Sequence, residues 1–251
     1  MTMQTPSKIV VNAAAMTDIG LTRQENQDAV AMQGWVGLAA QLSSPWKGQL
    51  EAGQSCFLGV IDGMGGHSGG ADAAALAGLG LRQVVDVGAE GRAQALEALS
   101  DKLLAAGQAW STPDMGATIA VLVIETGGVR VFNLGDCRVV RLIDGYLGEL
   151  TVEDRTSSPL GPLVTQSLGG EPRAFDPHEI ELPHLHGKTR YLLSSDGLVI
   201  DDTQIANLLA SGTPSESASA LIKATLGVGA PDNVTVIVVD VWAAEEQQLG
   251  R

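Results

Sequence analysis

The stretch GVIDGMGGHSGG, Gly59 to Gly70, decides the fold and raises the question of function. An apolar, strand-like segment runs into a single carboxylate, Asp62, and then into a turn rich in glycine and serine. Glycine-rich turns after strands often bind phosphate, so a nucleotide-binding fold is the first alternative. A dinucleotide-binding pattern would need glycine at Ser68, and a P-loop would need lysine at Ala71. Both patterns fail, and the carboxylate needs another explanation.

Composition indicates a mixed α and β protein. Of 251 residues, 45% are hydrophobic but only 4% are aromatic, which predicts a core of Val, Leu, Ile and Ala, as in a sheet under Ala-rich helices. The formal charge of −14 would repel nucleic acid and anionic membranes, so neither is an expected partner. The same acidity is compatible with carboxylates that hold cations.

The two cysteines lack the spacing of a disulfide framework or a zinc site, which is typical of a reducing compartment. The first residues lack a charged start followed by a long apolar core, and no later window offers about 18 unbroken apolar residues. We therefore expect a cytoplasmic protein.

Apolar periodicity predicts strands in the middle of the chain with helices around them. The turns at Glu125–Gly128 and Asp144-Gly145 indicate hairpins, and the second dipeptide favours a type I′ turn. This arrangement is typical of an α+β fold and not of strict βα alternation. The expected strands are Cys56–Ile61, Thr118–Ile124, Val129–Leu134, Arg138–Ile143, Arg190–Leu193 and Val234–Val241, and the expected helices are Ala71–Val87, a stretch around Leu96–Trp110, and Pro214–Leu226.

One segment, Thr156–Pro183, is rich in Pro, Gly and Ser and weak in periodicity. We interpret it as a long loop or flap, because loops of this length are usually functional or mobile. Exposed loops on a rigid scaffold commonly set specificity, so the flap is a candidate for substrate docking.

The dipeptide Asp-Gly that follows the opening strand at Asp62 recurs at Asp196, in YLLSSDG, after another apolar strand. Either alone would be read as a turn, since Asp-Gly favours turns and the chain has 29 acidic residues. Two further segments complete a set, because Arg23 stands five residues before Asp28 and Asp232 precedes the last apolar strand. Carboxylates at several strand ends can meet in space.

In order and type, these segments resemble the PP2C-type, metal-dependent protein serine/threonine phosphatases, particularly the compact bacterial members. The segment MGATIAVLVIETGGVRVFNLGDCRVVRLIDGYLGELT, Met115 to Thr151, resembles the central hairpins of that family, including its Gly-Asp-Ser-Arg-like signature at Gly135–Arg138. The resemblance extends over about residues 17–241, with the flap at about 156–183. We expect residues 1–251 to form a single catalytic domain.

The resemblance implies a four-layer α/β/β/α sandwich of two antiparallel sheets, with two divalent ions at one end. By that resemblance, Asp62 bridges both ions and the Gly63 carbonyl helps to bind one of them. Asp196 and Asp232 hold one ion, and Asp28 anchors the other mainly through waters. Hard Mn²⁺ or Mg²⁺ prefers such oxygen ligands. A water between two ions is acidified and can attack phosphorus in line.

Further positions follow from the same resemblance. Arg23 matches the family's phosphate-binding arginine, whose planar fork holds two phosphoryl oxygens. Met64 stands where some members have a histidine that is a candidate general acid. Asp114 is the nearest candidate for a weaker third metal site. Two other aspartates are expected to be structural from their own positions: Asp136 through local hydrogen bonds near a tight turn, and Asp240 as an exposed residue near the end of the last strand.

These features predict a monomeric, metal-dependent phosphatase that hydrolyses phosphoserine and phosphothreonine in proteins and opposes a kinase in bacterial signalling. Two alternatives stay open. One is a catalytically weak, phosphoprotein-binding regulatory module, motivated by Met64 and the short flap. The other is a metal-dependent hydrolase of small phosphate esters, which the unknown flap leaves open.

Overall fold

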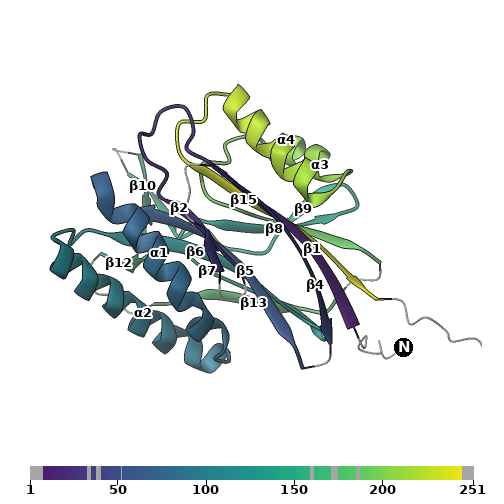
Figure 1. The fold of residues 1–251 in the computed structure, drawn as a ribbon, viewed down its shortest axis with the longest axis horizontal. Helices are drawn as coiled ribbons and strands as arrows, with labels where there is room; N and C mark the ends of the chain where they lie inside the picture. The colour runs from purple at the N-terminus through teal and green to yellow at the C-terminus, as the bar shows by residue number, and fades with distance from the viewer. Residues whose placement is uncertain are drawn as a thin grey trace, which may run out of the picture.

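The computed structural model describes residues 8–32, 35–37, 41–51, 53–158, 161–170, 175–184 and 187–244. Within these residues the chain forms four layers, with two antiparallel sheets face to face and a helical layer on each outer side (Figure 1). The predicted α+β sandwich is confirmed.

The first sheet ends in the predicted hairpin of β8 (Arg138–Ile143) and β9 (Tyr146–Glu149). Asp144 and Gly145 form its turn, and both have positive φ, of 49° and 86°, as a type I′ turn requires. Two strands of this sheet, β1 (Lys8–Asp18) and β4 (Gln41–Glu51), lie in the N-terminal part of the chain, where the sequence predicted no strands. In spatial order the strands are β4 (Gln41–Glu51), β1 (Lys8–Asp18), β15 (Val234–Ala243), β14 (Thr189–Ser194), β8 (Arg138–Ile143) and β9 (Tyr146–Glu149).

The second sheet contains the first half of the opening stretch, which lies in β5 (Ser55–Met64). It also contains the second predicted hairpin, β6–β7, which turns after Glu125. A short strand, β12 (Leu168–Gly169), pairs with β6 beside the main path. In spatial order the other strands are β13 (His178–Leu182), β7 (Gly128–Leu134), β6 (Gly116–Glu125), β5 (Ser55–Met64), β2 (Asp28–Met32) and β3 (Trp35–Gly37).

Helices α1 (Gly66–Val85) and α2 (Ala89–Trp110) cover the second sheet, and α3 (Asp202–Leu209) and α4 (Pro214–Gly227) cover the first (Figure 1). The helix predicted from Ala71 begins earlier, at Gly66, so the second half of the opening stretch is its first turn. Glycine has a low helix propensity, which hid this turn from the periodicity. No described helix combines the length and apolarity needed to cross a bilayer.

Three apolar clusters separate the four layers. Leu58 and Val239 belong to the cluster between the sheets. Leu81 belongs to the cluster under α1 and α2, and Leu221 to the one under α4. Both sheets are therefore buried on both faces, which explains their continuous Val, Ile and Leu runs.

The interpretation of Thr156–Pro183 as one long loop is wrong for its described part. Two short strands, β10 (Arg155–Ser158) and β11 (Gly161–Val164), pair with each other as a hairpin. The strands β12 and β13 follow. Residues 159–160 and 171–174 of this segment lie outside the described residues. Strands of this length are defined by their pairing partners, so a local pattern could not reveal them.

The expectation that Asp240 is exposed is also wrong. Its carboxylate is buried in β15 and accepts hydrogen bonds from Arg190 Nε at 2.6 Å and Nη2 at 2.8 Å. Lys188 Nζ lies 3.1 Å from the same carboxylate. Arg190 stands opposite Asp240 in the pairing of β14 with β15, and it also donates to the carbonyls of Leu209 and Gly212. Asp240 is therefore structural, as a buried ion-pair partner that ties the end of α3 to the sheet.

Candidate metal centre

Strand pairing brings Asp28 and Asp62 together. The two residues stand directly opposite each other in the antiparallel pair of β2 and β5, at the end where β5 leads into α1. Asp28 is only 1% exposed, and its Oδ2 accepts a hydrogen bond of 2.8 Å from Ser195 Oγ. Because Ser195 follows β14 in the facing sheet, this bond joins the two sheets beside the carboxylates.

Asp196 and Asp232 reach the same place from the facing sheet. Asp196 directly follows Ser195, and its charge, after burial and the charge of Asp28, raises the pKa of Asp62. Asp232 lies between α4 and β15. Burial raises the pKa of both Asp62 and Asp196, and the charge of Asp232 adds to both shifts. The four aspartates singled out in the sequence are thus neighbours at one end of the sandwich.

Asn233 is a positioning residue that the sequence analysis did not single out. Its Nδ2 donates to the carbonyls of Ile19 and Glu25, each at 2.9 Å, and its Oδ1 accepts from Gln27 N at 2.8 Å. The loop that carries Arg23 and leads to β2 is thereby fixed to the start of β15. The signal in the sequence was its position next to Asp232, but only the folded chain shows its partners.

Gly63 sits where the backbone has no room for a side chain. A Cβ on this residue would lie 2.1 Å from the carbonyl oxygen of Gly70 and 2.6 Å from that of Gln27. Its N–H donates to the Gln27 carbonyl at 3.2 Å. Glycine is therefore required for the close approach of β5, the first turn of α1 and the loop before β2.

Arg23 and Asp62 line a common cleft of about 480 Å³, together with Gly63, Met64 and Asp232. Arg23 Nη2 donates to Asp232 Oδ2 at 2.5 Å. The guanidinium is 54% exposed, and this hydrogen bond raises its pKa, so it stays charged. The cleft therefore presents a fixed positive group and a carboxylate to any molecule that enters it.

A second arginine, Arg155, contacts the cluster and was missed by the sequence analysis. Its Nε donates to Asp136 Oδ2 at 2.6 Å, and its Nη2 donates to Asp196 Oδ2. Asp136, which was expected to be structural, is buried in the turn between β7 and β8. Its charge raises the pKa of Asp62 and Asp196. A fifth carboxylate therefore belongs to the electrostatics of this site.

The pKa values of the aspartates follow from burial and crowding. Burial raises the pKa of Asp28 to about 7. Burial and then the charge of Asp28 hold the pKa of Asp62 well above its usual range. Burial and then the charge of Asp136 raise the pKa of Asp196. Carboxylates that oppose one another's ionisation are stabilised by added cations, so the cluster favours the binding of positive ions.

The donor set fits hard divalent ions, since it consists of carboxylate oxygens and a backbone carbonyl. In the part of the chain that the structure describes, no three His, Cys, Asp or Glu side chains converge as ready metal ligands. Arg23 and Arg155 instead hold two of the aspartates. Asp114 has an exposed side chain, and its backbone oxygen would lie 3.0 Å from a Cβ on Gly65.

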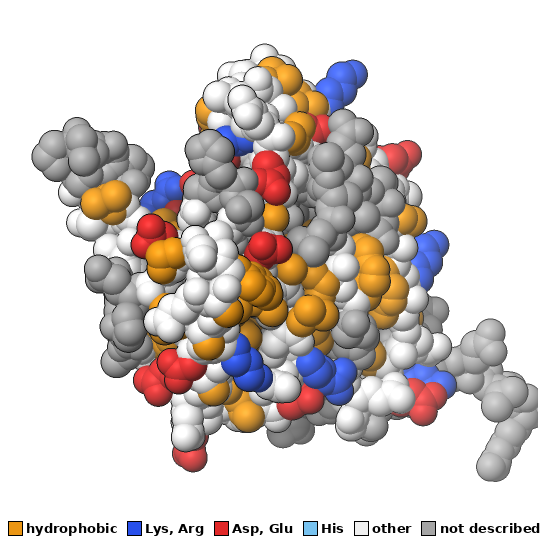
Figure 2. Space-filling model, turned by 60° about the vertical axis from the view of Figure 1, so that its left-hand side comes forward, with side chains coloured by type: hydrophobic (Ala, Val, Ile, Leu, Met, Phe, Trp, Pro, Cys, Tyr) orange, Lys and Arg blue, Asp and Glu red, His pale blue; other side chains and the backbone are white. Residues whose placement is uncertain are grey.

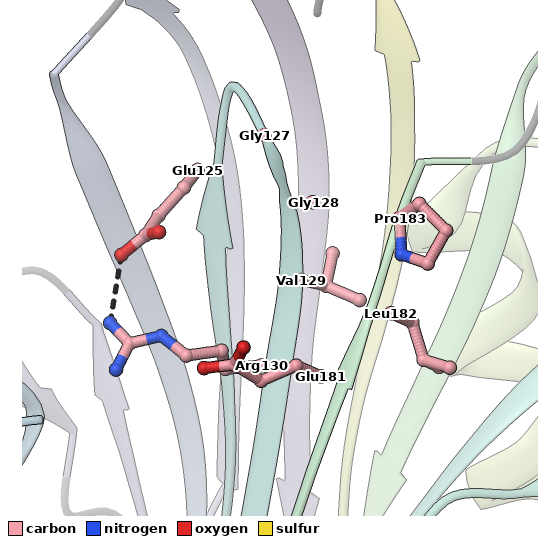
Figure 3. A pocket seen from close by; sticks show the side chains of 8 residues that line it. All are labelled: Glu125, Gly127, Gly128, Val129, Arg130, Glu181, Leu182 and Pro183. Carbon is pink, nitrogen blue, oxygen red and sulfur yellow. Dashed lines mark hydrogen bonds and ion pairs between the residues drawn. The ribbon is translucent and has the colours of Figure 1, made fainter. Parts of the chain in front are cut away.

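Another cleft, of about 520 Å³, opens at the far end of β6 (Figure 3). Glu125 and Arg130 point toward each other there and form an ion pair of 2.7 Å. Glu125 pairs with Ser55, whereas the metal end of the sheet pairs Thr118 with Asp62. Seven residues of strand separate the two ends, roughly 23 Å. This cleft contains none of the predicted site residues.

On the face shown in Figure 2, the described Lys and Arg side chains form small separate groups among acidic and apolar side chains. Charge on this face is therefore mixed.

The structure is a four-layer sandwich with a cluster of aspartates at one end of its two sheets, and comparison with known proteins identifies the family. Residues 45–215 match the family model described as protein phosphatase 2C. The chain belongs to this family, and the resemblance drawn from the sequence is confirmed.

Individual relatives agree with this assignment. The chain is 31% identical to the serine/threonine protein phosphatase PstP of Mycobacterium tuberculosis over 93% of its own length, but it spans only 45% of that relative. It is 28% identical to the protein phosphatase PhpP of Streptococcus pneumoniae, over 89% of the chain and 95% of the relative. The solved catalytic domain of PstP in complex with two manganese ions is 28% identical, covers 93% of this chain and 99% of that chain, and superposes with a TM-score of 0.72.

Proposed function

We propose that this chain is a metal-dependent protein serine/threonine phosphatase that hydrolyses phosphoserine and phosphothreonine. The observation that carries the proposal is the meeting of Asp28, Asp62 and Asp196 across two sheets, beside a cleft that Arg23 lines. The printed names of PstP and PhpP support a phosphoprotein substrate. Membership of the family supports the reaction class.

The cofactors in this proposal are two divalent ions, Mn²⁺ or Mg²⁺, which the manganese complex of PstP supports. When bound, the ions supply an activated water and compensate charge at phosphorus. Asp62 would be a ligand of both ions, and the Gly63 carbonyl would be a ligand of one of them. Asp196 and Asp232 would hold one ion, and Asp28 would hold the other mainly through waters. A weaker third site at Asp114 remains part of the proposal.

Arg23 binds the phosphoryl group in this proposal. Its guanidinium is exposed on the cleft wall and stays charged, and its planar fork matches two phosphoryl oxygens. Binding of substrate exchanges its present contact with Asp232 for the phosphate. Met64 lines the same cleft but has no proton to give, so the leaving alkoxide takes its proton from another group.

The partners proposed are phosphoserine- and phosphothreonine-containing proteins, with a Ser/Thr kinase as the opposing enzyme. We propose that the chain acts as a monomer in the cytoplasm. The two cysteines, which are both buried free thiols, support a reducing compartment.

The test is Mn²⁺-dependent phosphate release from a phosphothreonine peptide. We expect Asp62→Asn and Asp196→Asn to lower the rate by roughly 100-fold or more, because each removes several kcal/mol of charge stabilisation. Asp144→Asn is the matched control, since it makes the same chemical change in an exposed hairpin turn where Asn tolerates positive φ.

Two results would contradict the proposal. A native chain that binds Mn²⁺ and the phosphopeptide but releases no phosphate would be a regulatory module. A native chain that hydrolyses sugar phosphates or nucleotides but no phosphopeptide would be a small-ester hydrolase.

A further inference from the structure

Arg155 is a charged group at the cluster for which the proposed reaction has no role. It is the first residue of β10, and its guanidinium bridges two carboxylates. Nε donates to Asp136 Oδ2 at 2.6 Å, and Nη2 donates to Asp196 Oδ2. The planar fork of arginine allows one side chain to hold a buried carboxylate and a proposed metal ligand at the same time.

Hydrogen bonds of the neighbouring residues hold Arg155 close to Asp136. Asp154 N donates to the Gly135 carbonyl at 3.0 Å, and Asp154 Oδ2 accepts from Gly135 N at 2.8 Å. Thr165 N donates to the Asp154 carbonyl at 2.7 Å and closes the base of the β10–β11 hairpin. The residues before Arg155 and Asp136 are therefore hydrogen-bonded to each other.

The two ion pairs of Arg155 differ in burial. The side chain of Asp136 is 3% exposed, whereas that of Asp196 is 27% exposed. Breaking a buried pair leaves an uncompensated charge in the interior, which is far more costly than breaking a solvated one. The contact with Asp196 is consequently the one that can be exchanged.

Arg155 does not take the place of Arg23 at the substrate. Arg23 lines the cleft and is 54% exposed, whereas Arg155 is 31% exposed and is not among the described residues that line it. Arg155 therefore acts on the charge of the ligands and not on the phosphoryl group.

We propose that Arg155 is a built-in counter-ion of the metal centre, which neutralises Asp196 in the metal-free protein and gives up this contact when a divalent ion binds. A guanidinium and a divalent ion repel each other and are attracted by the same carboxylate. Asp136 retains the guanidinium after the exchange. The centre consequently binds metal less tightly than its aspartates alone would. This inference rests on the proposed metal-dependent function.

Calorimetric titration of the metal-stripped full chain with Mn²⁺ tests this role without requiring turnover. R155Q removes the charge but keeps a polar side chain, and R155K keeps the charge. R138Q is the control for net charge, because Arg138 pairs with Glu149 and Asp202 outside the cluster. We expect R155Q to bind Mn²⁺ about tenfold more tightly than the native chain, within the usual range of coupling between two ligands. R155K and R138Q are expected to stay close to native.

Equal or weaker Mn²⁺ binding by R155Q would overturn the proposal, since Arg155 would then be indifferent to the metal or would orient Asp196 as a ligand. An equal gain in R138Q would overturn it as well, because net charge alone would explain the effect. If R155Q binds Mn²⁺ more tightly than the native chain but the native chain releases no phosphate, the proposed function is overturned and the counter-ion role is supported.

The native chain provides a second test if R155Q does not fold. Hydrogen exchange of the β10–β11 amides is measured with and without Mn²⁺. We expect faster exchange with Mn²⁺, because the hairpin loses its tie to Asp196. Unchanged or slower exchange would overturn the proposal.

Discussion

At the residue scale, Asp28 is the most buried of the four proposed ligands. Burial raises its pKa to about 7, from an ordinary value of 3.8. The native chain therefore holds this proton over a pH range in which the unfolded chain has lost it. The contribution of this proton to the stability of the native state is fully present below about pH 4 and is lost as the pH rises through about 7.

The pH dependence of stability checks this behaviour. In EDTA, we expect the Tm of the native chain to fall as the pH is raised from about 4 to 7, the window bounded by the two pKa values. In Asp28→Asn the fall should be shallower, because no proton is released at that position. A steeper or equal fall in Asp28→Asn would contradict the assignment.

At the scale of elements, α4 is the helix that its own sequence determines most completely. Thr213 Oγ1 accepts from Glu216 N, and the Glu216 side chain accepts from Thr213 N, which together form a capping box with Pro214 in the first helical position. The predicted helix Pro214–Leu226 therefore agrees with the observed Pro214–Gly227. All of these signals act within four residues.

Removal of the cap should weaken this helix measurably. We expect Thr213→Ala to lower the free energy of unfolding by about 1 kcal/mol, because an N–H at the helix start loses its partner. Chemical denaturation measures the change. Ser215→Ala, at an exposed position in the same turn, is the matched control and should be close to neutral. Equal losses in both variants would show that the capping box contributes nothing.

The β10–β11 hairpin is the opposite case at this scale. Its strands have four residues each, and among the described residues they pair with each other and with no other strand. Its attachment to the molecule comes from Asp154 and Arg155, whose partners lie in the turn after β7 and at the end of β14. No local pattern encodes those partners, so the segment resembled a loop.

At the scale of the whole molecule, the proposed metal centre exists only in the folded chain, because its aspartates come from segments as distant as Asp28 and Asp232. Metal binding to the native state alone adds to stability. We expect Mn²⁺ at 100 times its Kd to raise the free energy of unfolding by about 2.7 kcal/mol. Thermal unfolding in Mn²⁺ and in EDTA measures this gain. A gain of the same size in Asp62→Asn would show that the ions bind elsewhere.

Periodicity in the sequence located the apolar strands in the middle and at the end of the chain, turn chemistry located two tight hairpins, and capping signals located helix α4. Motif order selected the four aspartates and Arg23 as the candidate site. These features depend on periodicity, turn chemistry and motif order, which act over a few residues or are independent of packing. Only the tertiary structure decided that Arg155 reaches Asp136 and Asp196 and that Asp240 is buried. Arg155 and Asp196 are 41 residues apart, and Arg23 and Asp232 are 209 apart. Partners at such separations are selected by strand register and sheet packing, because these fix which side chains share a site.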